Sequence, residues 1–130
     1  MITYLSVEWK KQCKQQSGSA ILIVDGKKKR VTYAELSMRG DVLKQQDGPL
    51  QAGASAEFFS FLAEVVSQWE GMADYSVSPY EDIWWKIKIR ETSRRIYRIT
   101  GTSVYPPCGA IIERKILALC EEAGIHVAYK

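Results

Sequence analysis

The sequence has few of the side chains that bind metals or form disulfides. It contains one histidine, His126, and three cysteines in 130 residues, with no C-x-x-C or H-x-x-x-H pair. Structural zinc takes four ligands, usually from such close pairs. An odd number of irregularly spaced cysteines also gives no disulfide framework. We therefore expect no metal site, and we expect reduced thiols, as in a cytoplasmic protein.

Long apolar runs and the glycine-rich motifs that bind nucleotides are also absent. No run of about 18 apolar residues occurs, so we expect no membrane-spanning helix. Residues 1–5 lack the basic start of a signal peptide, and residues 8–14 are polar. Neither G-x-G-x-x-G nor G-x-x-x-x-G-K-S/T is present. These absences predict a cytoplasmic protein with no membrane partner and no cofactor.

The length and composition are those of one domain covering residues 1–130. Hydrophobic residues make up 46% of the chain and charged residues 25%. A domain of this size buries roughly two-thirds of its unfolded surface, so its core can hold the fold without a disulfide or a metal. Aromatic residues make up 11%, which supplies side chains for a core and for a binding surface.

The N-terminal part is expected to contain a helix, a strand and a turn. Ser6 can cap a helix that runs to about residue 16. The branched apolar run 20–24 indicates a central strand, and Asp25-Gly26 indicates a turn after it.

The next two segments are predicted from their turn and cap signals. Residues 27–33 are a candidate return strand, but Thr32 and Glu35 also form a capping-box pattern with which a helix could begin. Residues 40–54 contain an Asp-Gly-Pro sequence and a further glycine. We predict that this stretch is a loop.

Two longer helices are predicted from apolar residues at helical spacing. The first begins at Ser55, and Gly71 lies near its end. The second begins near residues 107–110 and ends at Gly124, before a final strand over residues 125–129. The apolar positions of the first helix are Phe58, Phe61, Leu62, Val65, Val66, Trp69 and Met72. Those of the second helix are Ile112, Ile116, Leu119, Cys120 and Ala123.

Strict alternation predicts a β-hairpin between residues 83 and 100. Over residues 83–90, four apolar residues alternate with one tryptophan and three basic residues. This pattern is typical of a strand with one face in the core and one in water. A turn near residues 91–93 and a return strand over 94–100 complete the hairpin. In total we expect an α+β fold: a mixed, mainly antiparallel sheet of four to five strands, with three to four helices mainly on one face.

Positive charge is concentrated on this hairpin. Residues 83–100 contain six basic residues and one acid, whereas the rest of the chain contains twelve basic and fourteen acidic side chains. If like charges oppose each other across the two strands, an anionic partner would relieve their repulsion. The candidate binding residues are Trp84, Lys86, Lys88, Arg90, Arg94 and Arg98. The second basic cluster, residues 27–30, is expected to be only a charged hairpin tip.

The basic hairpin favours a small non-enzymatic module that docks on an acidic protein, as an inhibitor or an immunity-type protein would. Arginine and aromatic side chains are common anchors of such interfaces. The alternative is nucleic-acid binding, with Trp84 or Tyr97 stacked on a base, although the net charge of +3 is modest for that role. The simplest alternative is a solvated edge hairpin, whose lysines prevent aggregation. A homo-oligomer is a further alternative, in which the strand 125–129 is the contacting edge.

Cys108 gives the one hint of an enzyme. We expect it at the first turn of the last helix, where the helix dipole lowers the pKa of a thiol. His126 follows the far end of that helix, roughly 22 Å away for about 15 residues, so a Cys–His dyad is disfavoured. We expect no catalytic residue, and a cysteine-dependent enzyme is the least favoured alternative.

Overall fold

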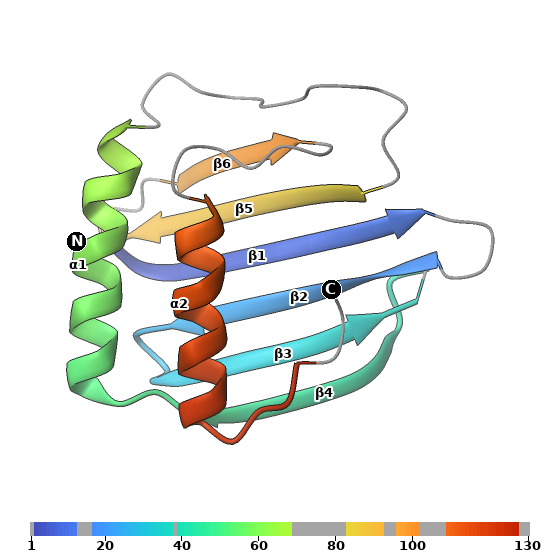
Figure 1. Cartoon of the computed structure of the whole chain (residues 1–130), viewed down its shortest axis with the longest axis horizontal. Helices are drawn as coiled ribbons and strands as arrows, with labels where there is room; N and C mark the ends of the chain where they lie inside the picture. Colours follow the sequence, from blue (N-terminus) through green and yellow to red (C-terminus); the bar gives the residue numbers. More distant parts are fainter. Residues whose placement is uncertain are drawn as a thin grey trace.

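One antiparallel sheet organises the part of the chain described by the computed structural model, which comprises residues 2–12, 17–37, 39–68, 83–92, 96–101 and 109–127. Six strands form the sheet in the order β4-β3-β2-β1-β5-β6. Two helices lie side by side on one face of it (Figure 1). The α+β class and the placement of helices on one face are therefore confirmed, whereas the sheet has six strands instead of four to five, and all of its described pairs are antiparallel instead of mixed. No helix within the described ranges is long and apolar enough to cross a membrane.

The strands follow each other as hairpins, with one exception. Every neighbouring pair is antiparallel, and β5 returns after the first helix to pair with the free side of β1. The N-terminal strand is therefore in the middle of the sheet. The strands are β1 (Ile2–Gln12), β2 (Ser17–Asp25), β3 (Arg30–Leu36), β4 (Val42–Pro49), β5 (Ile83–Glu91) and β6 (Ile96–Gly101).

The predicted helix over residues 6–16 is wrong, because β1 occupies this region as far as residue 12. Leu5 and Val7 are buried at 0% and 3% exposure, and Trp9 packs against the same core. This spacing of two is the period of a strand. Two long ladders, one to β2 and one to β5, satisfy the backbone of β1, and these tertiary bonds outweigh the local capping signal at Ser6.

The predictions for residues 32–54 also need correction. The capping-box residues lie in β3, where the Thr32 hydroxyl donates to Asp47 Oδ1 at 2.6 Å and the Tyr33 hydroxyl donates to Glu35 Oε1 at 2.9 Å. The predicted loop 40–54 contains β4 and the start of a helix instead. β4 was missed because it is an edge strand with almost no buried side chain, so it lacks the alternation that marks a half-buried strand.

Other predictions from the strand patterns are confirmed. The apolar run 20–24 lies within β2, in the interior of the sheet. The turn after it is held by Asp25, whose Oδ1 accepts the amides of Lys27 at 3.0 Å and Lys28 at 3.1 Å. β5 and β6 pair as the predicted hairpin.

The two described helices are α1 (Ala52–Gln68) and α2 (Gly109–Glu122), against the three to four expected. Four apolar positions predicted for α1 are buried, namely Phe58, Leu62, Val65 and Val66. Four predicted for α2 are buried as well, namely Ile112, Ile116, Leu119 and Cys120. Trp69, Gly71, Met72 and Cys108 lie outside the described residues.

After α2 the chain does not form the predicted strand over its described part, residues 125–127. Gly124 adopts a φ of 79°, and the amide of Ile125 donates to the carbonyl of Cys120 at 2.8 Å, which ends the helix. His126 is then held by the side chain of Gln46 in β4. Gln46 Nε2 donates to the His126 carbonyl at 2.9 Å, and the His126 amide donates to Gln46 Oε1 at 3.0 Å. A side chain thus takes the place of a strand partner.

The core fills the space between the sheet and the helices. It combines alternate residues of the inner strands, such as Leu5, Leu22 and Ile89, with the apolar faces of both helices. The opposite face of the sheet is covered by none of the described elements (Figure 1).

Candidate functional site

The open face of the sheet carries aliphatic residues at its centre. Ile21 and Ile23 alternate with the buried Leu22 and Val24 of β2, and they are only half-buried. In β3, Leu36 is half-buried as well. These residues lie outside the core cluster, so the chain exposes apolar side chains on a face where water-exposed strands usually carry polar ones.

A shallow hollow of about 540 Å³ lies over strands β1 to β4 on this face. Its aliphatic lining consists of Ile21, Ile23, Ala34, Leu36 and Val42. Three basic residues, Lys28, Arg30 and Arg90, also line it. Two aspartates, Asp25 and Asp47, line it as well, so the hollow combines an apolar floor with charged walls in which basic residues outnumber acidic ones.

One row of cross-strand neighbours brings together two basic clusters that are far apart in the sequence. Arg90 of β5 pairs with Tyr4 of β1, Tyr4 pairs with Asp25, and Asp25 pairs with Arg30. The guanidinium carbon of Arg90 lies 3.9 Å from the centroid of the Tyr4 ring, which is a cation–π contact. The basic turn at residues 27–30 therefore belongs to the same surface as the basic hairpin.

The sequence-predicted site residues occupy neighbouring positions where they are described. Lys86 and Lys88 are half-buried on β5, and Arg90 is exposed. Arg98 takes the register position opposite Lys88, and Trp84 the position opposite Lys10. Arg94 lies outside the described residues.

The neighbours on β1 compensate these charges only in part. Glu8 pairs with Lys86, but Lys88 pairs with Ser6 and Arg90 with Tyr4. Two consecutive outward positions of β5 thus have no acidic neighbour on β1. The sequence did not predict that Tyr4, Arg30 and the central isoleucines share one surface. The reason is that residues 6–16 were predicted as a helix, whereas the strand β1 connects these residues across the sheet.

A negative group borders the hollow on the β4 side. The hydroxyl of Thr32 and the carboxamide of Gln45 donate to Asp47 at 2.6 and 3.1 Å. These hydrogen bonds, and then the charge of Arg30, hold the pKa of the Asp47 carboxyl below its usual range. The face is therefore asymmetric: basic toward β5 and the β2–β3 turn, and acidic at Asp47.

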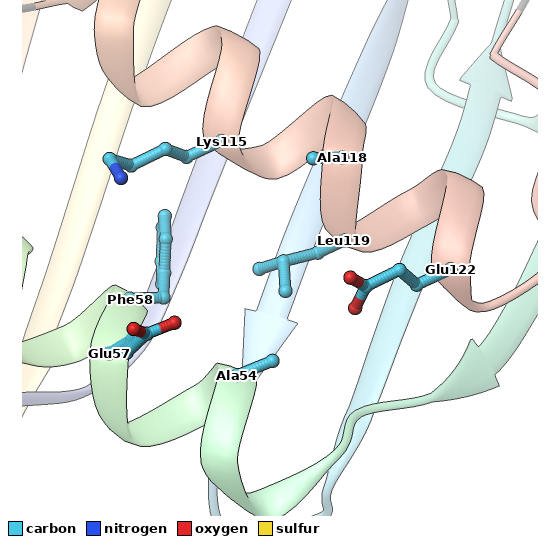
Figure 2. A pocket seen from close by; sticks show the side chains of 7 residues that line it. All are labelled: Ala54, Glu57, Phe58, Lys115, Ala118, Leu119 and Glu122. Atoms are coloured by element: carbon cyan, nitrogen blue, oxygen red, sulfur yellow. The ribbon is translucent and has the colours of Figure 1, made fainter.

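A second hollow, of about 310 Å³, lies between α1 and α2 (Figure 2). Phe58 and Leu119 form its apolar part, and the exposed Glu57 and Glu122 lie around it. The ammonium of Lys115 is 4.7 Å from the centroid of the Phe61 ring. We find here no nucleophile paired with a base, and no convergent set of donors that would orient a small ligand.

The candidate catalytic residues gain no support from the structure. His126 is exposed, and its backbone is bonded to Gln46, while Cys108 is not among the described residues. Burial raises the pKa of the Cys120 thiol to about 11, so that thiol is a core group. The described residues contain no cluster of three or more His, Cys, Asp or Glu side chains that could hold a metal ion.

Comparison with known proteins finds no matching family model and no similar curated protein. A functional proposal must therefore rest on the residues of the chain. The open sheet face, with its hollow and its basic border, is the most distinctive surface of the described structure.

Proposed function

We propose that this chain is a small non-enzymatic binding module that docks its open sheet face, led by the basic hairpin 83–100, on an acidic protein surface. The observation that carries this proposal is the meeting of both basic clusters, through Arg90 and Arg30, around one aliphatic hollow. A protein that covers the functional surface of another, as an inhibitor or an immunity-type protein does, would use such a face.

The chemistry of the face supports a protein partner. Burial of aliphatic side chains favours association because it removes apolar surface from water, and arginines are common anchors of protein interfaces. Charge on the border accelerates the encounter with an oppositely charged surface. The register also places Lys88 opposite Arg98, a like-charge pair that carboxylates of a partner would stabilise.

The same face is less suited to nucleic acid. Among the aromatic side chains that the structure describes, Tyr4 alone lies in the hollow, and the guanidinium of Arg90 already covers its ring. Proteins that bind single strands use free aromatic faces for stacking. The aliphatic floor, which includes Ile21 and Ile23, has no counterpart in a phosphate backbone.

The experiment is a pull-down from native cell extract with wild type and with a Lys88→Glu/Arg98→Glu variant, each with and without nuclease. A matched control, Arg39→Glu/Arg114→Glu, makes the same change in net charge at two exposed positions outside the hollow. We expect wild type and the control to capture one acidic protein, and the hairpin variant to lose it. The captured protein is then purified and tested for direct binding.

Three outcomes would contradict the proposal. Equal loss of the partner in both charge-reversed variants would show that only net charge matters. Capture that disappears with nuclease would assign the face to nucleic acid. Capture that is unaffected by charge reversal at Lys88 and Arg98 would show that the hairpin takes no part in the interface.

A further inference from the structure

The aliphatic lining of the hollow forms a strip that runs along the strands. Ile21 pairs with Ala34, Ile23 lies two residues nearer the β2–β3 turn, and Leu36 pairs with Val42 at the other end. Successive rows are two residues apart, so three rows extend for about 13 Å. An α-helix of about nine residues has this length at a rise of about 1.5 Å per residue.

The width of the strip also matches a helix. The strip passes obliquely from β2 at the turn end to β3 and β4 at the other end, so each row covers one or two strands, and neighbouring strands are about 4.8 Å apart. A helix with its side chains is about 10–12 Å across and would cover two to three strands. A single extended segment would cover about one strand spacing and would turn every second side chain away from the floor.

Charge around the strip determines which helix fits. Lys88 and Arg90 lie on the β5 side, and Lys28 and Arg30 lie toward the turn. Asp47 lies on the opposite side, in β4, and an aspartate carboxyl is ionised at neutral pH. A helix seated on the aliphatic floor therefore meets Lys88 and Arg90 on the β5 side, Arg30 and Asp25 at the turn end, and Asp47 on the β4 side.

We infer that the partner of this face contributes an amphipathic α-helix, with an apolar stripe on the aliphatic strip and with acidic residues toward Lys88 and Arg90 on the β5 side and toward Arg30 at the turn end. This inference rests on the proposed function, because it specifies which element of an acidic protein partner occupies the hollow. The opposite face of the same sheet is covered by α1 and α2 (Figure 1). The partner helix completes a helix–sheet–helix arrangement.

The test uses two synthetic peptides of about 16 residues with identical composition of leucine, glutamate, alanine and glutamine. In one peptide the leucines have helical spacing with glutamates on one flank, and in the other leucines and polar residues alternate as in a strand. Each is titrated into the isotope-labelled full chain and followed by NMR. The methyl signals of Ile21 and Ile23 are assigned from the Ile21→Val and Ile23→Val variants.

We expect the helical peptide to bind at least about tenfold more tightly than the alternating peptide, a difference of about 1.4 kcal/mol. It should shift the methyl signals of Ile21 and Ile23 and gain helicity on binding. An Arg30→Glu/Arg90→Glu variant should lose about tenfold or more in affinity, and Arg39→Glu/Arg114→Glu should not. The four positions are exposed, so the variants are expected to fold, and their amide spectra will verify this.

Equal affinity of the two peptides, methyl shifts outside the hollow, or no binding at millimolar concentration would each overturn the inference. The proposed function is judged separately, by loss of a cellular partner on charge reversal at Lys88 and Arg98. A partner lost in that experiment, with no preference for the helical peptide, would leave the proposed function in place and exclude the helix. If wild type captures no partner in the pull-down, both the proposed function and the inferred partner helix are contradicted.

Discussion

At the scale of single residues, Gly48 is required by the close approach of β4 to the end of α2. A Cβ atom at this position would lie 2.6 Å from Ala123 Cβ and 2.7 Å from the Ala123 carbonyl oxygen. Both distances are shorter than van der Waals contact, and one of them involves backbone. We expect Gly48→Ala to lower the free energy of unfolding by about 1–3 kcal/mol, measured by urea denaturation.

Gly53 supplies the matched control for this substitution. It lies in α1, and a Cβ there would meet nothing within 4 Å. Gly53→Ala should raise the free energy of unfolding by about 0.5–1 kcal/mol, because alanine loses less backbone entropy in a helix. Equal effects of the two substitutions would show that the contact between Gly48 and Ala123 does not form.

Cys120 is expected to be chemically silent in the folded protein. Burial raises the pKa of its thiol to about 11, compared with about 8.5 for an exposed cysteine. In a Cys13→Ser/Cys108→Ser variant, a thiol reagent at pH 8 should react with Cys120 in urea but not under native conditions. Rapid native labelling would show that this part of α2 is open to solvent.

The same pKa shift predicts a loss of stability at high pH. The folded state holds the Cys120 proton more tightly than the unfolded state, so the contribution is complete below about pH 8.5. It should decline as the pH rises through the folded-state pKa of about 11. A Cys120→Ala variant should lack this part of the alkaline decline, which urea denaturation at several pH values measures.

Asp47 should behave in the opposite sense at low pH. Hydrogen bonds from Thr32 and then Gln45 lower its pKa in the folded state. Its contribution to stability is present above an ordinary aspartate pKa of about 3.9 and is lost as the pH falls through the lowered value. Thr32→Val should raise the pKa of Asp47, measured by NMR titration, and Gln45→Ala should raise it less. A larger rise in Gln45→Ala would contradict this order.

At the scale of elements, one side chain of β4 holds the backbone of the segment after α2. The carboxamide of Gln46 donates to the His126 carbonyl and accepts its amide. Each hydrogen bond contributes about 1 kcal/mol net, so Gln46→Ala should accelerate hydrogen exchange of the His126 amide by about tenfold or more. Gln45→Ala is the control, because the described bond of the Gln45 side chain is to Asp47. Unchanged exchange in Gln46→Ala would mean that the buried Ile125 holds the segment without Gln46.

The elements also show where sequence patterns succeed. The hairpin 83–100 and the helices were predictable, because the burial of one face imposes periods of two and 3.6 on the residues themselves. β1 and β4 were not. In the sequence of this region, Leu5, Trp9 and Cys13 also match helical spacing, which favours a helix over β1. In β4 the edge position removes the apolar pattern altogether.

At the scale of the whole molecule, the two faces of the sheet should differ in their sensitivity to truncation. Leu5 is fully buried under the helices, whereas Ile23 is half-buried on the open face. We expect Leu5→Ala to cost about 2–5 kcal/mol of unfolding free energy, and Ile23→Ala to cost clearly less, since less apolar area leaves the protein. Comparable costs in urea denaturation would imply that the open face is covered in the isolated chain.

The candidate site belongs to the same scale. Its basic hairpin could be found in the sequence, because alternation and charge are local properties. That residues 27–30 belong to the same surface could not be found in the sequence. It depends on the register, which places Arg30, Asp25, Tyr4 and Arg90 in one row across the strands. That row exists only because β1 lies between β2 and β5.

Local patterns in the sequence are sufficient to predict the α+β class, the hairpin with its excess of basic residues, and the apolar faces of both helices. Each of these follows from spacing along the chain, because a residue's own neighbours decide whether its face can be buried. Tertiary structure alone decided that β1 is a central strand and that the last described segment is no strand. It also joined the two basic clusters across an aliphatic hollow. These features depend on pairing between residues that are distant in the sequence. Local periodicity does not indicate which distant segments pair, because it reflects only which side of a segment is buried.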